Sequence, residues 1–366
     1  MKKIEFQELL EWAWAIRELP SSIEGLLIDK DLILAGDKEG NVVCWNHEGE
    51  KVWSQSFGNR VENFRLHETI YDANLFLVAG LEIFGVNTKS GKIIWKHELE
   101  GISDWVEIDK INETVVATSS VFDIEYSDFL EGSYWIFSFQ GELLKTQKMD
   151  EKTWHLHADD EGIFLGLGRP SNKIVKIDKD KIDYLNTPDS PICCGYKNIF
   201  GHANGSITLT KDNEITTMNV SNSRISTIHV KDNFILISDE VGELYCLVDK
   251  INKWKFKADG ELALVSCFTS KNFNFVFACT RTDNGSQIYL LNLSNGELIL
   301  ESFSKFSIRT IDNNENMLLI GLSNGKIITI ESDLLLRRID EDDGKDNNID
   351  NINRKSMLEK LRNLRK

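Results

Sequence analysis

The sequence predicts an all-β fold, an eight-bladed β-propeller of four-stranded antiparallel blades with a short C-terminal helix. Short β-rich runs that end in a small residue recur along the chain, and glycine-containing turns follow them at regular places. The small residues are Gly36, Gly80, Thr118, Gly166, Gly201, Ser238, Cys279 and Gly321. Their spacing, about 41 residues on average, is typical of one four-stranded propeller blade.

Two sets of turns divide each repeat into short strands. One set follows the small residue directly, as in Ser323-Asn324-Gly325, and the other lies one strand later, as in Ser294-Asn295-Gly296. Asn-Gly pairs supply the positive φ that tight hairpins require. Such a four-stranded meander cannot bury both of its faces alone, whereas several packed side by side can. The number of repeats favours eight blades, and seven is the alternative.

The N-terminal region contains a segment that resembles an outer strand. We expect residues 11–17 to close the last blade by pairing beside residues 326–330, which would remove an open sheet edge. The alternative is a short helix over residues 4–15, since Leu9 and Ala13, among others, also fit helical spacing.

The outer strands resemble those of a known superfamily. Residues 49–53 (GEKVW) and 91–95 (GKIIW) are similar to the repeats of the quinoprotein-like (PQQ-like) propeller superfamily, which overlaps with WD40-like propellers. The resemblance covers roughly residues 11–335, but the Trp-Asp dipeptide of WD40 blades is missing, and Trp45-Asn46 is the nearest match. The resemblance implies the fold and no particular activity.

The composition indicates which classes of partner are disfavoured and which cellular compartment to expect. The chain of 366 residues carries a net charge of −16, which argues against long-range attraction to nucleic acid or an anionic membrane. No secretory signal and no transmembrane segment are recognisable, and the six cysteines form no regular framework. We therefore expect a cytoplasmic protein with reduced thiols.

Two local features of the sequence are candidates for a cofactor site or a metal site. Quinoprotein dehydrogenases carry a vicinal disulfide beside their cofactor, and this chain has Cys193-Cys194; the alternative is two thiols that fill separate packing sites. His155 and His157 lie two residues apart on a predicted strand and so face the same side, which makes them weak candidates for a metal site. The alternative is a histidine pair that lines a wet channel. We expect no cofactor, no metal and no catalytic residue.

An insertion in the third repeat is a candidate partner-binding loop. Residues 121–135 alternate acidic with aromatic residues, and aromatic side chains commonly anchor interfaces. The candidates are Phe122, Tyr126, Phe129, Tyr134 and Trp135. The alternative is a loop that covers a neighbouring blade.

The composition changes after residue 339. We predict a propeller over residues 1–339, an acidic disordered linker over 340–353 and a basic amphipathic helix over 354–366. Residues 340–366 carry equal numbers of acidic and basic side chains, so the whole negative charge belongs to the propeller. The candidate docking residues of the helix are Met357, Leu361, Leu364, Lys360, Arg362, Arg365 and Lys366. The alternatives for the helix are contact with nucleic acid or anionic lipid, a solvated tail, or docking on the propeller itself.

These features together predict a non-catalytic scaffold for protein–protein interaction, a monomeric propeller within a complex, with the C-terminal helix as a second docking element. One alternative is a quinoprotein-like or metal-dependent enzyme that uses the axial channel. Another is a nucleic-acid-associated factor that binds through the basic tail.

Overall fold

The computed structural model describes residues 2–179, 181–211, 214–271 and 273–343. Within these residues the chain forms eight sheets, antiparallel except where β1 joins β30, and two helices. It divides into two compact units, one of residues 1–56 with 264–366 and the other of residues 57–263. The predicted fold class, an eight-bladed β-propeller of four-stranded blades, is confirmed, and eight sheets exclude the seven-bladed alternative.

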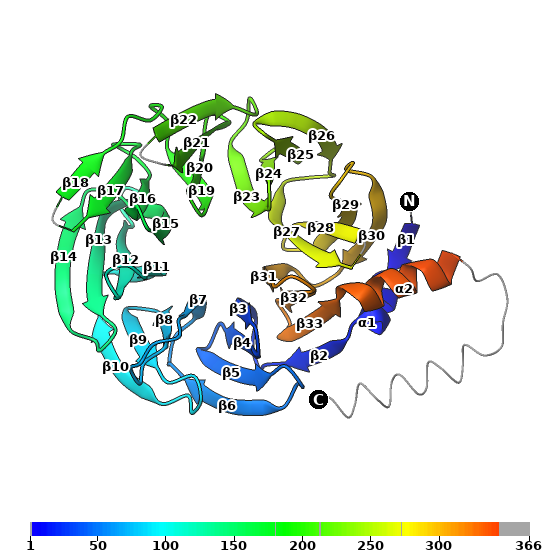
Figure 1. Cartoon of the computed structure of the whole chain (residues 1–366), viewed down its shortest axis with the longest axis horizontal. Coiled ribbons are helices and arrows are strands. Elements are labelled where there is room, and N and C mark those ends of the chain that lie inside the picture. The colour runs from blue at the N-terminus through cyan, green and yellow to red at the C-terminus, as the bar shows by residue number, and fades with distance from the viewer. Residues whose placement is uncertain (1, 180, 212–213, 272, 344–366) are drawn as a thin grey trace. The chain divides into compact units, whose positions relative to one another are not determined.

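The second unit holds five sheets, each built from four consecutive strands (Figure 1, β7 to β26). The first strand of each sheet lies beside the first strand of the next, so these strands form the inner edges. The strands are β7 (Val61–Leu66), β8 (Leu75–Ala79), β9 (Glu82–Val86) and β10 (Ile93–Glu98); β11 (Ile102–Asp109), β12 (Thr114–Asp123), β13 (Asp128–Ser138) and β14 (Leu143–Met149); β15 (Thr153–Asp159), β16 (Gly162–Leu167), β17 (Ile174–Asp178) and β18 (Lys181–Tyr184); β19 (Ile192–Tyr196), β20 (Ile199–His202), β21 (Ser206–Lys211) and β22 (Glu214–Asn219); and β23 (Ile225–Lys231), β24 (Phe234–Asp239), β25 (Glu243–Val248) and β26 (Ile251–Lys257).

The first unit holds the other three sheets, and two of them take in N-terminal strands. One sheet consists of β3 (Ile23–Asp29), β4 (Leu32–Asp37), β5 (Asn41–Asn46) and β6 (Lys51–Ser56). A second consists of β27 (Leu262–Ser270), β28 (Phe273–Thr280), β29 (Ser286–Asn292) and β30 (Leu298–Ser304), with β1 (Lys2–Glu5) added in parallel to β30. The third consists of β31 (Ile308–Asn313), β32 (Met317–Leu322) and β33 (Lys326–Glu331), with β2 (Ala15–Glu18) as its outer strand.

The N-terminal region contains both the strand and the helix that the sequence allows. β2 pairs antiparallel with β33, so that Ala15 lies opposite Thr329, four residues later than the start expected for the strand. The preceding residues form helix α1 (Phe6–Trp12), which buries Leu9 and Trp12 against apolar side chains of β28–β33. Burial of this helical face explains why the strand is shorter than the expected range of 11–17.

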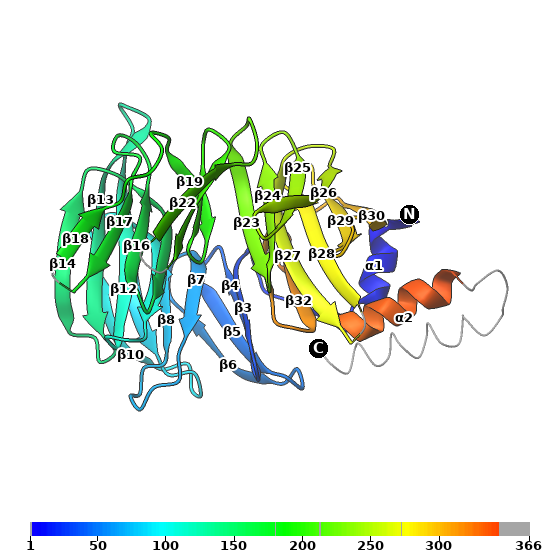
Figure 2. The same ribbon diagram turned by 45° about the horizontal axis from the view of Figure 1, so that its top comes forward.

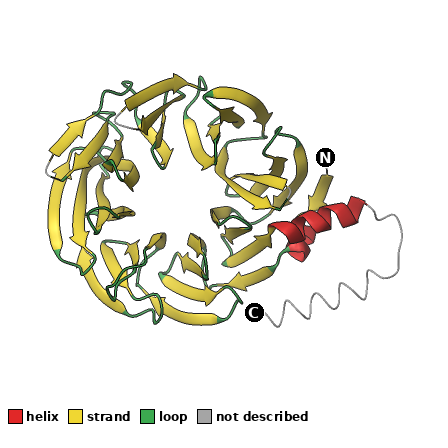
Figure 3. Cartoon of the chain, in the orientation of Figure 1, coloured by secondary structure: helices red, strands yellow, loops and turns green. Residues whose placement is uncertain are grey.

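The boundary predicted at residue 339 is wrong. The last strand ends at Glu331, and a second helix, α2 (Ser332–Asp343), takes in residues 340–343 of the expected linker. The Glu331 carboxylate accepts the backbone N–H groups of Asp333 (3.3 Å) and Leu334 (2.7 Å), and α2 packs beside α1 (Figure 3). The acidic composition of this region favoured a linker, but the helix has an apolar face. Its Leu335 and Ile339 are buried in the same cluster as α1.

The rest of the expected linker, 344–353, and the basic helix expected over 354–366 lie outside the described residues. Among the residues that the structure describes, no helix is long and apolar enough to span a membrane.

The small residues that mark the repeat lie where neighbouring sheets approach each other closely. A Cβ atom on Gly201 would lie 2.8 Å from Cγ2 of Ile225, the first residue of the next inner strand. Gly321 meets Ile23 of β3 in the same way, at 2.6 Å. Packing between blades therefore requires glycine at these two positions, which lie at equivalent places in their repeats.

Candidate protein-interaction site

The inner strand of each sheet in the second unit carries a β-bulge at the same place. Near the beginning of β7, β11, β15, β19 and β23, the register with the following strand shifts by one residue. Bulges re-aim side chains and are common beside functional sites. The extra residues are Glu62, Asp104, Trp154, Cys193 and Ser226. We call this end of the five sheets the bulge end.

The hairpin between β12 and β13 leaves the second unit from the bulge end. The beginning of β11 pairs with the end of β12, with Ile102 opposite Ser120, and both β12 and β13 then continue past that point as far as the pair Asp123 and Asp128. Asp123 Oδ1 accepts the N–H groups of Glu125 (2.8 Å) and Tyr126 (3.0 Å), which orders the turn. Figure 2 shows the hairpin extending beyond the ends of neighbouring strands.

The tip of this hairpin, residues 121–129, exposes large apolar side chains. Ile124 is 86% exposed, Tyr126 71% and Phe122 45%. Phe129 packs edge-on against Phe122, with ring centroids 5.1 Å apart, so the aromatic residues support each other. Exposed aromatic groups gathered on a projecting element are typical of interaction surfaces.

The hairpin also carries a concentrated negative charge. Residues 121–135 contain no lysine and no arginine. Their carboxylates belong to Asp123, Asp128, Glu125 and Glu131. An apolar tip flanked by carboxylates is complementary to a partner segment that combines apolar with basic side chains.

Lys152, just before β15, anchors the hairpin to the next sheet. Its ammonium pairs with the Asp104 carboxylate, lies 3.3 Å from Ser120 Oγ and sits over the Phe129 ring, 3.9 Å from its centroid. The Trp154 ring centroid lies 5.3 Å from the same ammonium. Burial raises the pKa of the Asp104 carboxyl group, and the positive charge of Lys152 acts in the opposite direction by lowering it. A cation between a carboxylate and two aromatic rings holds the base of the hairpin in place.

We expect Lys152→Met to lower the free energy of unfolding by about 2 kcal/mol, because the substitution leaves a largely buried Asp104 carboxylate without its cation. Limited proteolysis should cut the hairpin faster in this variant than in the wild type. Lys148→Met is the matched control, since Lys148 pairs with Glu100 at an exposed site, and it should leave the melting temperature unchanged. Equal melting curves for Lys152→Met and the wild type would show that Lys152 is no anchor.

Two of the five aromatic candidates do not belong to the exposed tip. Tyr134 is 1% exposed, and its hydroxyl donates to Gln147 Oε1 at 3.0 Å. Trp135 is half-buried, and its Nε1 donates to Ser119 Oγ at 3.0 Å. Both residues lie on the paired part of β13 and pack within the sheets, so the exposed tip does not include them, and their contact with a partner stays a prediction.

Comparison with known proteins shows the fold and nothing finer. No family model and no curated protein matches the sequence. Among solved structures, the computationally designed Ika8 protein is 14% identical with a TM-score of 0.69, and 87% of this chain covers 98% of that one. Sqt1 of Saccharomyces cerevisiae is 11% identical, with a TM-score of 0.67 and coverage of 87% and 98%.

Two further solved structures share the fold at similarly low sequence identity. The WD40 β-propeller domain of Doa1 is 12% identical with a TM-score of 0.54, and 87% of this chain covers 95% of it. BamB from Moraxella catarrhalis is 12% identical with a TM-score of 0.61, and the coverage is 86% and 97%. The likeness to these structures shows a β-propeller fold. The resemblance of the outer strands to these propellers is thereby confirmed for the fold, and a fold alone does not determine a function.

His155 and His157 have different surroundings in the propeller. His155 is buried between Trp105 and Phe200, its Nε2 lies 2.8 Å from the Lys197 carbonyl, and burial lowers its pKa to about 4. His157 is half-buried, with its Nε2 3.2 Å from Asp159 Oδ2. Across the described ranges, no three His, Cys, Asp or Glu side chains gather closely enough to hold a metal ion. His155 therefore acts as a core residue.

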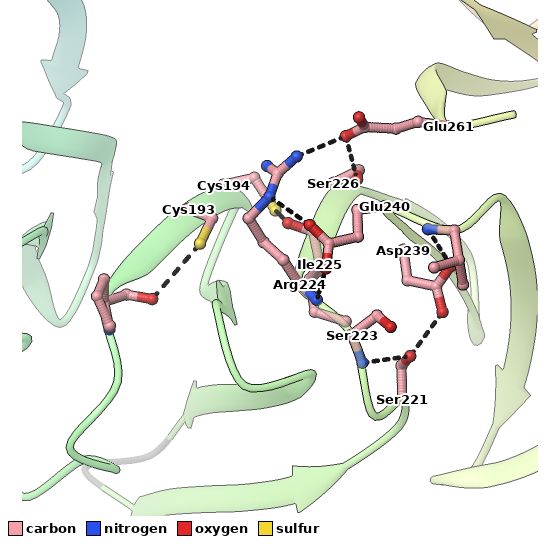
Figure 4. A network of polar contacts seen from close by, with 12 residues as sticks. Cys193, Cys194, Ser221, Ser223, Arg224, Ile225, Ser226, Asp239, Glu240 and Glu261 are labelled. Atoms are coloured by element: carbon pink, nitrogen blue, oxygen red, sulfur yellow. Dashed lines mark hydrogen bonds and ion pairs between the residues drawn. The ribbon is translucent and has the colours of Figure 1, made fainter.

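The vicinal cysteines are free thiols with separate contacts. Cys193 is the bulge residue of β19, so its Sγ lies 3.6 Å from the Pro191 carbonyl, while the Sγ of Cys194 lies 3.6 Å from the Ile225 carbonyl (Figure 4). Burial raises the pKa of both thiols, which disfavours the reactive thiolate. The geometry matches two thiols in separate packing sites.

A second ionic network lies beside Cys193 at the bulge end. Arg224 Nε is 3.3 Å from Glu240 Oε2, and its Nη2 is 2.8 Å from Glu261 Oε1, which also accepts the Ser226 hydroxyl (Figure 4). Sequence reasoning missed both this arginine and Lys152. A repeated pattern could have pointed to both residues. A basic residue, a buried β-branched residue and the bulge residue follow one another at 60–62, 152–154 and 224–226.

Proposed function

We propose that this protein is a non-catalytic scaffold that binds a protein partner through the tip of the β12–β13 hairpin. The observation that carries the proposal is the exposure of Phe122, Ile124 and Tyr126 on a hairpin anchored by Lys152. A rigid support lowers the cost of ordering a binding loop, and exposed aromatic side chains supply contact area. The WD40-type fold, typical of protein-interaction domains, supports the same function.

The partner should present a segment that combines basic and apolar side chains. Carboxylates flank the hairpin tip, and residues 121–135 contain no basic residue. Complementary charge speeds association and selects among partners, whereas burial of the aromatic side chains supplies most of the affinity. Binding should therefore weaken moderately, and not vanish, as the salt concentration rises.

The C-terminal segment is proposed as a second docking element. Residues 354–366 carry six basic residues and one acidic residue, and their apolar residues Met357, Leu361 and Leu364 fit one helical face. A helix of this length is marginal in water by itself, so it would order upon a partner surface.

The decisive experiment compares three full-length proteins in quantitative affinity purification. We expect Phe122→Ser/Tyr126→Ser to lose a partner that the wild type retains, with at least a tenfold loss of affinity when that partner is purified and titrated directly, since truncating two interface aromatics costs about 1–2 kcal/mol each. Tyr184→Ser, which alters a tyrosine 62% exposed on β18 of the same unit, is the matched control and should bind as the wild type does.

Equal binding by the wild type and the hairpin variant would contradict the hairpin as the interaction site. A fourth protein that ends at Asp343 tests the tail separately. Loss of the partner from this shortened protein, with retention by the hairpin variant, would assign the contact to the C-terminal segment alone.

A further inference from the structure

The projecting part of the β12–β13 hairpin is a ribbon of two strands. β13 pairs with β14 only as far as Gly132, which lies opposite Met149, and β11 pairs with β12 only as far as Ser120. Beyond these positions, residues 121–123 and 128–131 pair with each other and, within the described residues, with no third strand. A two-stranded ribbon is marginally stable in water at best, and its open edges can pair with another chain.

The edge of β13 is the more open of the two edges. A Cβ atom on Gly101 would lie 2.9 Å from Cγ2 of Val121, so the chain that leads into β11 lies against the beginning of the β12 edge. On β13, residues 128–131 all lie beyond the last pair with β14. The longer stretch of backbone available for pairing therefore belongs to β13.

The two faces of this ribbon differ in chemistry. Successive side chains of a strand point to opposite faces, and residues directly opposite each other on paired strands share a face. Phe122 lies opposite Phe129, so their rings share one face, with centroids 5.1 Å apart. The pairs on either side of them belong to the other face. The carboxylates of that face are those of Asp123, Asp128 and Glu131.

The acidic face contains a pair of like charges. Asp123 lies directly opposite Asp128, an arrangement that destabilises a strand pair. Both side chains are held in place by the hairpin backbone, since Asp128 Oδ1 accepts the Phe129 N–H at 2.8 Å and Asp123 Oδ1 accepts those of the turn. Residues 121–135 contain no basic side chain to offset the repulsion. A cation supplied from outside this segment would relieve it.

We infer that the partner of the hairpin binds as an added β-strand along residues 128–131, in the form of an extended segment in which basic and apolar side chains alternate. The inference rests on the proposed function and specifies the form of the partner. Alternation follows from strand geometry, because the basic side chains then meet the acidic face and the apolar ones meet the face of Phe129. Backbone hydrogen bonds supply the affinity of such a complex, and side chains select the partner.

The test uses a short fluorescein-labelled peptide of alternating lysine and valine as the probe, titrated by fluorescence anisotropy against the full-length protein. A derivative with an N-methyl group on every amide keeps the side chains and charges but cannot donate hydrogen bonds to a strand. We expect this derivative to bind roughly tenfold more weakly than the parent peptide. A peptide of alternating glutamate and valine should not bind, because its charge matches that of the hairpin.

Two further measurements locate the bound peptide. Asp128→Asn/Glu131→Gln should bind the parent peptide roughly fivefold more weakly than the wild type, since the backbone edge remains but its charge is lost. Glu113→Gln/Asp232→Asn is the matched control, because it removes the same charge from exposed turns at the opposite end of the same unit, and it should bind as the wild type does. Hydrogen exchange of the wild type should slow at residues 128–131 when the peptide is added.

Equal affinities of the parent peptide and its N-methylated derivative would overturn the added strand, because side chains alone would then account for binding. Exchange at residues 128–131 that the peptide leaves unchanged, or equal binding by the two charge variants, would overturn it as well. So would the absence of saturable binding up to about 1 mM peptide. None of these results would affect the proposed function, which fails only if Phe122→Ser/Tyr126→Ser retains the partner.

Discussion

A chain that begins at Leu19 will lose most of the stability of the first unit. The missing segment contains β1, α1 and β2, and so removes the outer strands of two sheets. It also removes three large buried side chains, Ile4, Leu9 and Trp12. At about 1.5–3 kcal/mol for each fully buried side chain, their loss costs about 5–9 kcal/mol. That is comparable with the whole stability of a typical domain, about 5–15 kcal/mol.

The edge that this truncation creates adds a second effect. Residues Ala15 to Glu18 cover β33, and without them the N–H and C=O groups of that strand are open to pairing with another chain. We expect aggregation together with a lower melting temperature, measured by size-exclusion chromatography and circular dichroism. Leu9→Ala in the full chain separates the two effects, since it should destabilise by about 2–5 kcal/mol and leave the sheet edge covered. A truncated chain that melts as the full chain does would show that the segment is dispensable.

Acid will destabilise the second unit through two buried histidines. His155 and His229 are both buried, and desolvation lowers the pKa of each to about 4, against about 6.5 in the unfolded chain. Between these values the unfolded state binds protons that the folded state does not, so stability falls as the pH falls. Each histidine should remove about 2 kcal/mol between pH 7 and pH 5 and about 3 kcal/mol by pH 4.

Urea unfolding at pH 7 and pH 5 measures this loss, and His155→Gln/His229→Gln is the informative variant. Glutamine does not titrate, and at position 155 its amide can still donate to the Lys197 carbonyl that His155 contacts. The variant should therefore be less stable than the wild type at pH 7 but lose much less on acidification. A loss of the same size in the wild type and the variant would show that neither histidine is held neutral in the fold.

The sequence predicted the repeated features of this protein well because they follow from local rules. Gly166, Gly201 and Gly321 must be small because a residue of the next inner strand lies against each of them, and the same contact recurs in these three repeats. Turns with Asn-Gly and alternating strands are likewise short-range signals. The same reasoning located the hairpin that exposes Phe122 and Tyr126, because an insertion into a regular repeat is visible in the sequence alone.

Features that depend on long-range packing were predicted less well. Tyr134 and Trp135 continue the aromatic pattern of the hairpin, but strand pairing places them within the sheets. The acidic residues 340–343 suggest a linker, but the apolar face formed by Leu335 and Ile339 makes them the end of α2. In both cases composition was a poor guide, because burial depends on which distant residues a side chain meets.

The sequence by itself determined the repeat and the place of the projecting hairpin, since each depends on residues close together in the chain, and it favoured eight blades over seven. Only the tertiary structure decided which polar groups meet. Lys152 reaches Asp104 across 48 positions, and Arg17 reaches Thr329 across 312. The physical reason is that the pairing and desolvation of a charge depend on groups brought together by folding, so no local pattern records whether a buried charge has a partner.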